Sequence, residues 1–418
     1  MDIIKITGGR KLYGEVHVQG AKNSVLPILA ASLLSKGTCV IHNCPSLSDV
    51  TASLAILRHL GCRAKQEGST VIIDSVDASR FDVPHDLMSE MRSSVIFLGA
   101  VLARFHRAEL SLPGGCELGP RPIDLHIKAM EALGADFCET AGNISCKADS
   151  LNAADINFTL PSVGATENAM IAACAANGTT VITNAAREPE IADLQNFLNA
   201  MGAKVKGAGT STVIVEGVSE FHGCTHTVIP DRIVAATYMS AAVSAGGEIF
   251  LRNTEKTHLE AVTDALRQTG ADIDCMGDVI HIIASDKPKA IRPVVTRPYP
   301  GFATDAQPPV MAAVLKAEGT SVFVENIFEN RFRHGDELNR LGADIRIIGR
   351  VAAVTGVDML RGIPVRASDL RGGAALVVAA LGAEGETLIT DIHHIRRGYD
   401  DIVYDLNCLG ACAGILKK

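Results

Sequence analysis

Apolar and polar positions follow one pattern that recurs six times along the 418 residues. Each copy contains a polar or charged cluster, a helix that is apolar on nearly every face, a glycine-led strand, and an amphipathic helix. The amphipathic helices end close to a Leu-Gly-Ala sequence, whose glycines lie 68 to 73 residues apart at Gly61, Gly134, Gly202, Gly270, Gly342 and Gly410. This period exceeds that of common solenoid repeats, so each copy is expected to be a compact unit with several elements.

The apolar helices are expected at residues 25–34, 95–105, 166–176, 232–245, 310–317 and 374–381. A helix that is apolar on all sides is buried, so the strands and amphipathic helices must form a coat around these six. A chain of this length normally divides into more than one domain. The pattern therefore predicts an α/β protein with two bundles of three repeats each.

Composition narrows the picture further. Apolar residues make up 47% of the chain, but aromatic residues only 4% and Trp is absent, so small aliphatic side chains must fill the core. A net charge of −8 gives no electrostatic support for a nucleic-acid partner. No apolar run reaches the ~18 residues of a membrane helix, and no export segment is evident. Eleven scattered cysteines are typical of free thiols in a reducing cytoplasm.

Four of the six polar clusters that precede the apolar helices contain a cation, namely Lys22, Arg92, Arg232 and Arg371. A helix N-terminus carries partial positive charge and attracts anions, so a cation there is unfavourable unless an anion is bound. We interpret the set as the binding site of an anionic ligand. The alternative is that these are solvated charges beside ordinary caps, and Asp231 with Arg232 could be only a capping pair.

Cys116 lies in a segment rich in Pro and Gly, residues 112–122, which is expected to be an exposed loop. A free thiol has a pKa of about 8.5 and can donate a proton at neutral pH. Arg121 nearby favours the thiolate, and Glu117 opposes this effect. Cys116 is therefore a candidate general acid or nucleophile; the alternative is that the thiol has no role.

Asp305 follows a Pro-rich segment and precedes an apolar helix, so it could be a general base or simply a helix cap. Two Arg pairs, at 331 and 333 and at 396 and 397, suit bidentate binding of phosphate or carboxylate. His222, Cys224 and His226 alternate along one segment, but three ligands without a second cluster favour a solvated strand over a zinc site. No glycine-rich dinucleotide or Walker motif is present.

Several of these segments resemble one known family over essentially the whole chain. They are Ala21-Lys22-Asn23, Pro113-Gly-Gly-Cys116, Gly119-Pro-Arg121-Pro-Ile-Asp124, Arg187-Glu-Pro-Glu190, Thr304-Asp305, Phe328-Glu-Asn-Arg331, Asp369-Leu-Arg371 and Arg397-Gly-Tyr399. The chain resembles the UDP-N-acetylglucosamine 1-carboxyvinyltransferases, which make the first committed precursor of peptidoglycan. The related 5-enolpyruvylshikimate-3-phosphate synthases share the sixfold repeat but lack this Cys loop.

The resemblance implies a two-domain, inside-out α/β barrel built from six βαβαββ repeats around buried helices. Residues 1–21 would join 230–418 in one domain with three repeats. Residues 22–229 would form the other, which includes the Cys116 loop. The active site would lie in the cleft between them.

The resemblance also implies an activity: transfer of the enolpyruvyl group of phosphoenolpyruvate to the 3′-hydroxyl of the UDP-sugar, through a tetrahedral ketal, with release of phosphate. No metal or organic cofactor is implied. The only expected partners are the two substrates, and a monomer is the expected oligomeric state. Two alternatives remain, a shikimate-type transferase and a non-catalytic UDP-sugar-binding regulatory paralogue.

Residue roles follow from the same resemblance. Cys116 would protonate the methylene carbon and form a covalent adduct, and Asp305 would accept the hydroxyl proton. Phosphoenolpyruvate would be bound by Lys22, Asn23, Arg92, Arg121, Arg331, Arg371 and Arg397. The UDP-sugar would contact Asn23, Arg92, Arg121, Pro122, Ile123, Asp124, Leu125, Ser162, Val163, Gly164, Asp305 and Ile327. Two positions depart from the family: Ala303 replaces the usual Pro, and Leu160 stands where some members have Lys.

Overall fold

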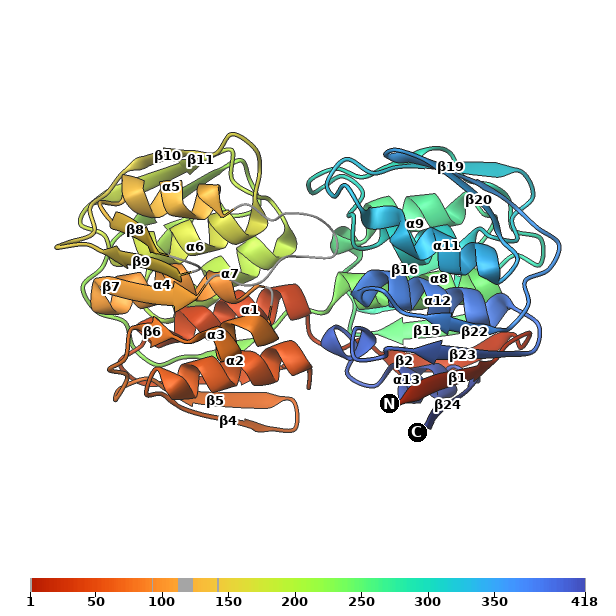
Figure 1. Cartoon of the computed structure of the whole chain (residues 1–418), viewed down its shortest axis with the longest axis horizontal. Helices are drawn as coiled ribbons and strands as arrows, with labels where there is room; N and C mark the ends of the chain where they lie inside the picture. Colours follow the sequence, from red (N-terminus) through yellow and green to blue (C-terminus); the bar gives the residue numbers. More distant parts are fainter. Residues whose placement is uncertain (1, 92, 112–122, 141–142, 418) are drawn as a thin grey trace. The chain divides into compact units, whose positions relative to one another are not determined.

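The computed structural model describes residues 2–91, 93–111, 123–140 and 143–417. The chain folds into two compact units (Figure 1). The continuous unit runs from Gly20 to Ile229, and the split unit combines the chain up to Gln19 with the chain from Pro230 onward.

The continuous unit has three helices at its centre and three four-stranded sheets around them. The central helices are α1 (Lys22–Ala31), α4 (Phe97–Phe105) and α6 (Val163–Ala173). The other helices are α2 (Ser48–His59), α3 (His85–Glu90), α5 (Asp124–Ala132) and α7 (Pro189–Ala200), with 3-10 turns η1 (Ser32–Leu34) and η2 (Ser94–Ile96). The strands are β3 (Thr38–His42), β4 (Arg63–Glu67), β5 (Thr70–Asp74), β6 (Asp82–Val83), β7 (Arg107–Ser111), β8 (Asp136–Thr140), β9 (Asn143–Lys147), β10 (Asp155–Asn157), β11 (Thr179–Thr183), β12 (Lys204–Lys206), β13 (Thr212–Glu216) and β14 (Thr225–Thr227).

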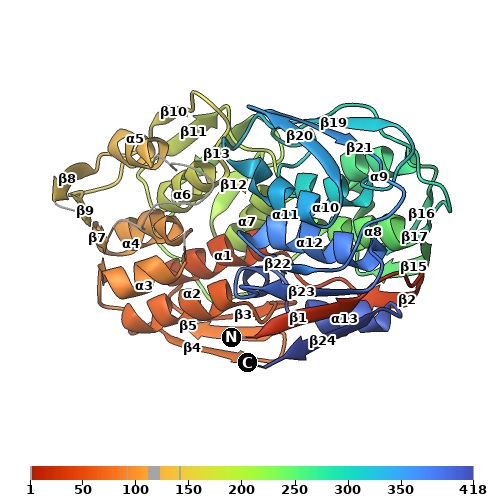
Figure 2. The same ribbon diagram turned by 45° about the vertical axis from the view of Figure 1, so that its right-hand side comes forward.

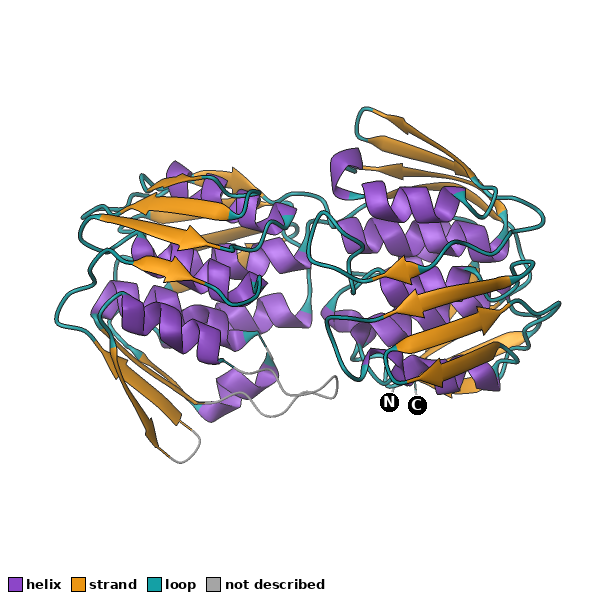
Figure 3. Ribbon diagram, turned by 90° about the horizontal axis from the view of Figure 1, so that it is seen from above, coloured by secondary structure: helices purple, strands orange, loops and turns teal. Residues whose placement is uncertain are grey.

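The split unit repeats this plan. Its central helices are α8 (Arg232–Ala245), α10 (Gln307–Ala313) and α12 (Leu370–Gly382), and its outer helices are α9 (Glu260–Arg267), α11 (His334–Arg340) and α13 (Ile402–Cys408). The 3-10 turns are η3 (Lys256–His258), η4 (Arg331–Arg333) and η5 (Ile395–Arg397). The strands are β1 (Ile3–Thr7), β2 (Leu12–His17), β15 (Gly247–Arg252), β16 (Asp272–Met276), β17 (Val279–Ile283), β18 (Val294–Val295), β19 (Thr320–Val324), β20 (Asp344–Ile348), β21 (Val351–Thr355), β22 (Pro364–Arg366), β23 (Glu386–Thr390) and β24 (Cys412–Leu416). Helices stack inside each unit and sheets lie outside them (Figure 3).

All six sheets share one topology, in which a parallel pair is followed by two antiparallel pairings. The orders are β14-β3-β5-β4, β6-β7-β9-β8, β10-β11-β13-β12, β2-β15-β17-β16, β18-β19-β21-β20 and β22-β23-β1-β24. Three sheets are completed by a strand from a distant part of the chain: β14 pairs with β3, β2 with β15, and β1 with both β23 and β24. The first and last strands are therefore neighbours, with Ile3 opposite Leu416 (Figure 2).

The repeat predicted from the sequence is visible in the backbone. The glycine that ends each amphipathic helix has a positive φ in all six copies, from +81° at Gly410 to +101° at Gly61. A left-handed residue at this position ends a helix, and glycine adopts it without strain. The six copies thus share one turn as well as one sheet topology.

The six apolar helices are buried, as predicted. Four of them, α1, α6, α10 and α12, begin three or four residues before the positions expected from the apolar pattern. The missed first turns of α1, α10 and α12 contain polar residues, while that of α6 begins with Val163, Gly164 and Ala165. As a result Lys22 and Arg371 lie inside the first turns of α1 and α12, and both are buried.

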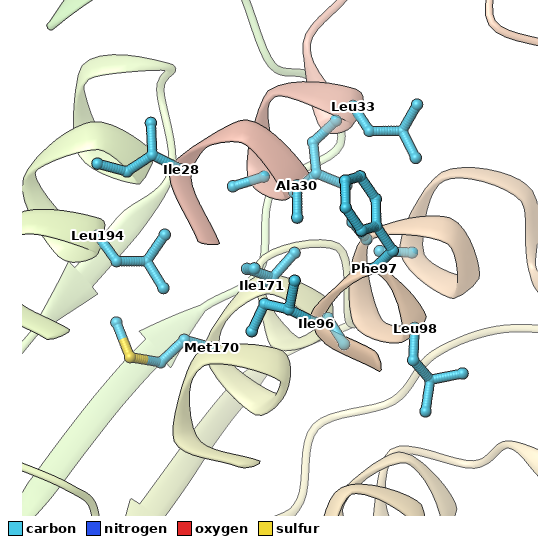
Figure 4. Close-up of a cluster of buried hydrophobic side chains, with 14 of the residues drawn as sticks. Ile28, Ala30, Leu33, Ile96, Phe97, Leu98, Met170, Ile171 and Leu194 are labelled. Atoms are coloured by element: carbon cyan, nitrogen blue, oxygen red, sulfur yellow. The ribbon is translucent and has the colours of Figure 1, made fainter. Parts of the chain in front are cut away.

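The core of the continuous unit is an apolar contact between α1, α4 and α6 (Figure 4). Ile28, Phe97 and Ile171 come from the three helices, and none of them is exposed. Within the described residues no helix is both long and apolar enough to cross a membrane.

Replacing Phe97 with Ala is expected to destabilise the continuous unit by about 3–5 kcal/mol, because the cavity cannot be refilled by helices already in contact. The measurement is urea unfolding followed by circular dichroism, since the chain has no Trp. Phe137→Ala is the control, because Phe137 on β8 is only half-buried. Equal losses for the two variants would contradict the proposed role of the helix contact.

Candidate active site

An ionic cluster centres on Asp305, which precedes α10 in the split unit. Nη2 of Arg331 donates to Oδ1 at 2.7 Å, while Nε and Nη2 of Arg371 lie 3.2 and 3.1 Å from Oδ2. Both Arg side chains are at most 3% exposed, and the Asp305 side chain is 28% exposed. Asp305 therefore forms the accessible part of an otherwise buried cluster.

The capping alternative for Asp305 is wrong. Helix α10 begins at Gln307, and no side chain caps its N-terminus. Burial would raise the pKa of the Asp305 carboxyl group, but the guanidiniums of Arg371 and Arg331 outweigh it and hold the pKa well below its ordinary value. Asp305 is thus ionised at neutral pH and is an acceptor of hydrogen bonds.

Local structure fixes both guanidiniums. Asp369 caps α12, accepting hydrogen bonds from the backbone N–H groups of Arg371 and Gly372 at 3.0 Å each, which sets the direction of the first turn. Arg331 begins η4, and its Nε and Nη2 donate to the carbonyl oxygen of Thr304 at 3.1 and 2.8 Å. Thr304, the residue before Asp305, therefore orients the Arg331 guanidinium.

Buried polar atoms without a hydrogen-bond partner lie in the same part of the split unit. They are Nη1 of Arg371, Nε2 of His334 and both amide atoms of Gln307. Burial lowers the pKa of His334 to about 4, although Asp369 opposes this, so its ring is neutral at pH 7. Unpaired buried polar groups are costly and call for a ligand or water.

Glu325 joins this cluster to the next segment and was not predicted from the sequence. Its Oε2 accepts a hydrogen bond from the Thr304 hydroxyl at 3.0 Å, and its Oε1 accepts from the N–H groups of Ile327 and Phe328 at 2.8 and 3.0 Å. Glu325 is 1% exposed, whereas Ile327 is 39% exposed. The sequence feature that could have pointed to Glu325 is its position as an acidic residue directly after the apolar strand β19.

Lys22 is the first residue of α1 in the continuous unit. Its Nζ lies 2.8 Å from Oδ2 of Asp49, and the two side chains are 9% and 1% exposed. Asp49 comes from the first turn of α2. A buried carboxylate on a second helix therefore holds this ammonium group in place, while Asn23 beside it is half-buried.

Two segments predicted for the UDP-sugar meet in the continuous unit. Ser162 caps α6, accepting a hydrogen bond from the N–H of Ala165 at 3.4 Å. A Cβ on Gly164 would lie 3.1 Å from the ring of His126 on α5, so glycine permits this close approach. Asp124 and Leu125 begin α5, directly after Ile123.

Asn168 fixes the junction between α5 and α6. Its Nδ2 donates to Nδ1 of His126 at 2.7 Å and to the carbonyl oxygen of Val95 at 2.9 Å, while its Oδ1 accepts from the N–H of Gly99 at 2.7 Å. Burial lowers the pKa of His126 to about 4, so the neutral ring can accept from Asn168. The uncharged His126 ring therefore holds the start of α6 in place through its contacts with Asn168 and Gly164.

Comparison with known proteins decides the family. The family model for EPSP synthase (3-phosphoshikimate 1-carboxyvinyltransferase) matches residues 6–406. UDP-N-acetylglucosamine 1-carboxyvinyltransferase 2 of Caldanaerobacter subterraneus subsp. tengcongensis is 50% identical over 411 residues, which cover 98% of this chain and 99% of the relative. The chain belongs to the UDP-N-acetylglucosamine 1-carboxyvinyltransferase family.

Solved structures confirm the fold predicted from the sequence. The enolpyruvyl transferase NikO from Streptomyces tendae is 27% identical, with a TM-score of 0.90 over 99% of this chain and 98% of that chain. EPSP synthase from Acinetobacter baumannii is 20% identical and has a TM-score of 0.76 over the full length of both chains. The carboxyvinyltransferase family thus shares the six α/β repeats with its shikimate relatives.

Some residues of this carboxyvinyltransferase-family chain lie outside the described part. They are Arg92, Cys116, Arg121 and Pro122. Arg397 is described at the end of η5 and is half-buried. The structure therefore brings Asp305, Arg331 and Arg371 together in one unit, and brings residues 123–125 close to 162–164 in the other.

Two other candidate cations, Arg232 and Arg396, have partners outside the Asp305 cluster. Asp231 caps α8, accepting from the N–H groups of Ile233 and Val234 at 2.8 and 3.0 Å, so the capping alternative holds for this pair. Arg232 stacks over Tyr299, with its Cζ 5.6 Å from the ring centre. Arg396 pairs with Asp2 at 2.7 Å.

The interpretation of His226 as a solvated residue is wrong. Its side chain is 11% exposed, and Nε2 lies 2.9 Å from Oδ1 of the buried Asp193 on α7. Asp193 also accepts hydrogen bonds from the Ser24 hydroxyl on α1 and from the N–H of Ile229 at 3.2 Å. In the described part of this carboxyvinyltransferase-family chain, no three His, Cys, Asp or Glu side chains gather into a metal site.

Proposed function

We propose that this chain transfers the enolpyruvyl group of phosphoenolpyruvate to the 3′-hydroxyl of UDP-N-acetylglucosamine and releases phosphate. This reaction is the first committed step of peptidoglycan precursor synthesis. The names of relatives that are 45–50% identical over nearly the whole chain support it. The structural observation that carries the proposal is the Asp305 carboxylate held by two buried guanidiniums, one of which has a nitrogen without a partner.

The charges of the substrates match these groups. Phosphoenolpyruvate carries a phosphate and a carboxylate, and each is recognised best by guanidinium or ammonium groups. In the proposed site Lys22, Asn23, Arg92, Arg121 and Arg397 contact this substrate, and Arg331 and Arg371 support them and the developing charge of the ketal. The two units are proposed to be the catalytic domains, with residues 1–21 and 230–418 in one, 22–229 in the other, and the substrates between them.

The proposed reaction has an addition step and an elimination step. In the addition, the Cys116 thiol gives its proton to the methylene carbon, the sugar 3′-oxygen bonds to the adjacent carbon, and Asp305 accepts the hydroxyl proton. In the elimination, the new methyl group returns a proton to the Cys116 thiolate to restore the double bond, and phosphate leaves with the proton that Asp305 had accepted. Cys116 can also add to phosphoenolpyruvate and form a covalent adduct.

The low pKa of Asp305 is compatible with this role. A carboxylate paired with two guanidiniums is a weak equilibrium base, so it does not deprotonate a free hydroxyl. As the sugar oxygen bonds to carbon, however, its proton becomes strongly acidic, and an ionised acceptor within reach then suffices. The guanidiniums keep Asp305 in the acceptor state throughout the neutral range.

The UDP-sugar is proposed to bind where α5 and α6 begin. Its contacts are Asn23, Arg92, Arg121, Pro122, Ile123, Asp124, Leu125, Ser162, Val163, Gly164, Asp305 and Ile327. Support comes from the close approach of Gly164 to His126, which brings residues 123–125 near 162–164. Leu160 is 56% exposed nearby in sequence and offers no charge to a diphosphate.

The proposed setting is the cytoplasm, where both substrates occur. The chemistry consists of proton transfers and one group transfer, so it needs neither a metal nor an organic cofactor. The proposed partners are the two small-molecule substrates, without a nucleic acid or a membrane, and the proposed oligomeric state is a monomer.

An acceptor assay tests the function. The protein is incubated with phosphoenolpyruvate and either UDP-N-acetylglucosamine or shikimate 3-phosphate, and released phosphate and product mass are measured. We expect phosphate and an enolpyruvyl product only with the UDP-sugar. Product only with shikimate 3-phosphate would establish the shikimate-type alternative, and UDP-sugar binding without phosphate release would establish the regulatory one.

A further inference from the structure

We propose that Asp193 is a positioning residue that holds the first turn of α1, and with it Lys22, in the place where Lys22 binds phosphoenolpyruvate. The proposal rests on the function proposed above for Lys22, and it adds a residue to which that function gives no role. Asp193 lies on α7 and its side chain is 2% exposed, so it acts through its neighbours. All residues in the argument belong to the continuous unit.

The first step is the set of groups that the Asp193 carboxylate binds. Its Oδ2 accepts hydrogen bonds from the Ser24 hydroxyl and, at 3.2 Å, from the N–H of Ile229. Its Oδ1 lies 2.9 Å from Nε2 of His226, and since a carboxylate only accepts hydrogen bonds, this nitrogen is the donor. One buried carboxylate therefore joins the first turn of α1 to β14 and to the segment that follows β14.

The second step is a further connection through Ile229. While its N–H donates to Asp193, its carbonyl oxygen accepts a hydrogen bond from the N–H of Ala21 at 2.8 Å. Ala21 directly precedes Lys22, and Ser24 follows Lys22 by two residues. Asp193 thus holds the chain on both sides of Lys22, at Ser24 directly and at Ala21 through Ile229.

The third step is the dependence of this helix start on outside contacts. The N-cap of α1 is Ala21, whose methyl group cannot accept a hydrogen bond from the first turn. The Lys22 ammonium group is held by Asp49 on α2, at 2.8 Å. Asp49 therefore fixes the end of the Lys22 side chain, while Asp193 fixes the backbone from which that side chain extends.

The chain offers a matched control just after the other end of α1. Ser32 begins η1 and is fully buried, as Ser24 is. Its hydroxyl donates to the carbonyl oxygen of Leu29 at 2.6 Å, so this hydrogen bond stays within one helical turn. Ser24→Ala and Ser32→Ala each remove one buried serine hydrogen bond, but only Ser24→Ala releases α1 from Asp193. A general loss of stability should therefore affect both variants equally.

The kinetic test measures KM for phosphoenolpyruvate and kcat for wild type, Ser24→Ala and Ser32→Ala. We expect KM for phosphoenolpyruvate to rise about five- to tenfold in Ser24→Ala, the effect of one lost hydrogen bond. The value of kcat should change less than about twofold, because a displaced ammonium group weakens substrate binding without removing a group that reacts. Ser32→Ala should keep both constants within about twofold of wild type. Equal KM values in the two variants would overturn the proposal.

A double variant tests whether Asp193 acts through Ser24. Asp193→Ala should raise KM for phosphoenolpyruvate at least as much as Ser24→Ala does. If the two residues act through one contact, adding Ser24→Ala to Asp193→Ala should change KM by less than about twofold, whereas independent effects would multiply. Multiplied effects would contradict the proposal, and Ser24→Ala alone keeps it falsifiable if Asp193→Ala does not fold.

A measurement without substrate separates this proposal from the proposed function. Each variant is treated briefly with an amine-acylating reagent, and the labelling of Lys22 is followed by peptide mass spectrometry. Lys22 should be labelled at least ~5-fold faster in Ser24→Ala than in Ser32→Ala, because its helical turn opens more often. The exposed Lys36 is the internal reference, and its labelling should be the same in both variants.

The outcomes of the two kinds of test are distinct. Equal labelling of Lys22 in the two variants would overturn the positioning role even if the enzyme is active. An inactive wild type with the expected difference in labelling would reject the proposed function and leave the positioning of Lys22 by Asp193 supported.

Discussion

Asp305→Ala is expected to lower kcat by about 10²–10⁴-fold, the range typical of a lost general base, while substrate binding is largely retained. The reason is geometric: Asp305 is the most accessible member of the ionic cluster, and its carboxylate is the acceptor that Arg331 and Arg371 keep ionised. Steady-state kinetics together with calorimetric binding of the UDP-sugar measure the two effects separately. A loss confined to binding would reassign Asp305 to a structural role.

The same substitution should reduce stability, because it leaves two buried guanidiniums without their carboxylate. Removing one partner of a buried ion pair costs about 3–5 kcal/mol, and the partial exposure of Asp305 places this case at about 3 kcal/mol. Asp344→Ala is the matched control, since Asp344 pairs with the exposed Arg346 on β20 at 3.5 Å. Its expected change is within about 0.5 kcal/mol.

The pH dependence gives an independent check on Asp305. Its folded-state pKa is lowered from the ordinary value of 3.8, so its stabilising contribution is fully present above that value and is lost as the pH falls through the folded-state pKa. The stability difference between wild type and Asp305→Asn should therefore be constant from pH 5 to 8 and shrink below about pH 4. A difference that shrinks between pH 6 and 7 would contradict the lowered pKa.

Cys116→Ala is expected to abolish multiple turnover, because no other group is proposed to give a proton to the methylene carbon. Loss of a positioned general acid lowers the rate by about 10²–10⁴-fold, which takes a typical kcat below detection in a phosphate assay. Cys116→Asp should keep substantial activity, since a carboxylic acid can also donate the proton. Full activity of the Ala variant would remove Cys116 from the mechanism.

Chemical modification provides the control for this thiol. An epoxide phosphonate such as fosfomycin should add once at Cys116 in the presence of the UDP-sugar, because its phosphonate resembles the phosphate of phosphoenolpyruvate. Cys138 on β8 is exposed but has no proposed anion site, so Cys138→Ala should still form the adduct and Cys116→Ala should not. Intact mass and peptide mapping distinguish the two cysteines, and an adduct at Cys138 would indicate simple exposure.

The hydrophobic pattern predicted the six buried helices because their apolar character is local and continuous. It placed four helix starts too late, since residues such as Lys22 and Arg371 look like loop charges until the helix is seen to include them. The pattern also could not show that β1, β2 and β14 complete sheets whose other strands are far away in the chain. Strand pairing depends on long-range register, which periodicity does not encode.

For the candidate site too, the sequence identified some residues and only the structure showed how they are used. Motifs selected Asp305, Arg331 and Arg371, but a motif cannot tell a capping aspartate from one that faces two guanidiniums. Partners such as Asp49 and Glu325 had no distinctive signal, because a single acidic residue next to an apolar segment is common in any chain.

The sequence alone determined the sixfold repeat, the buried helices and the family, because each depends on residue types in a fixed order. Only the tertiary structure decided which polar residues meet: Asp305 with two arginines, Lys22 with Asp49, and Tyr399 with Thr237. The physical reason is that a charge or hydroxyl acquires its chemistry from burial and from neighbours that folding brings from distant parts of the chain.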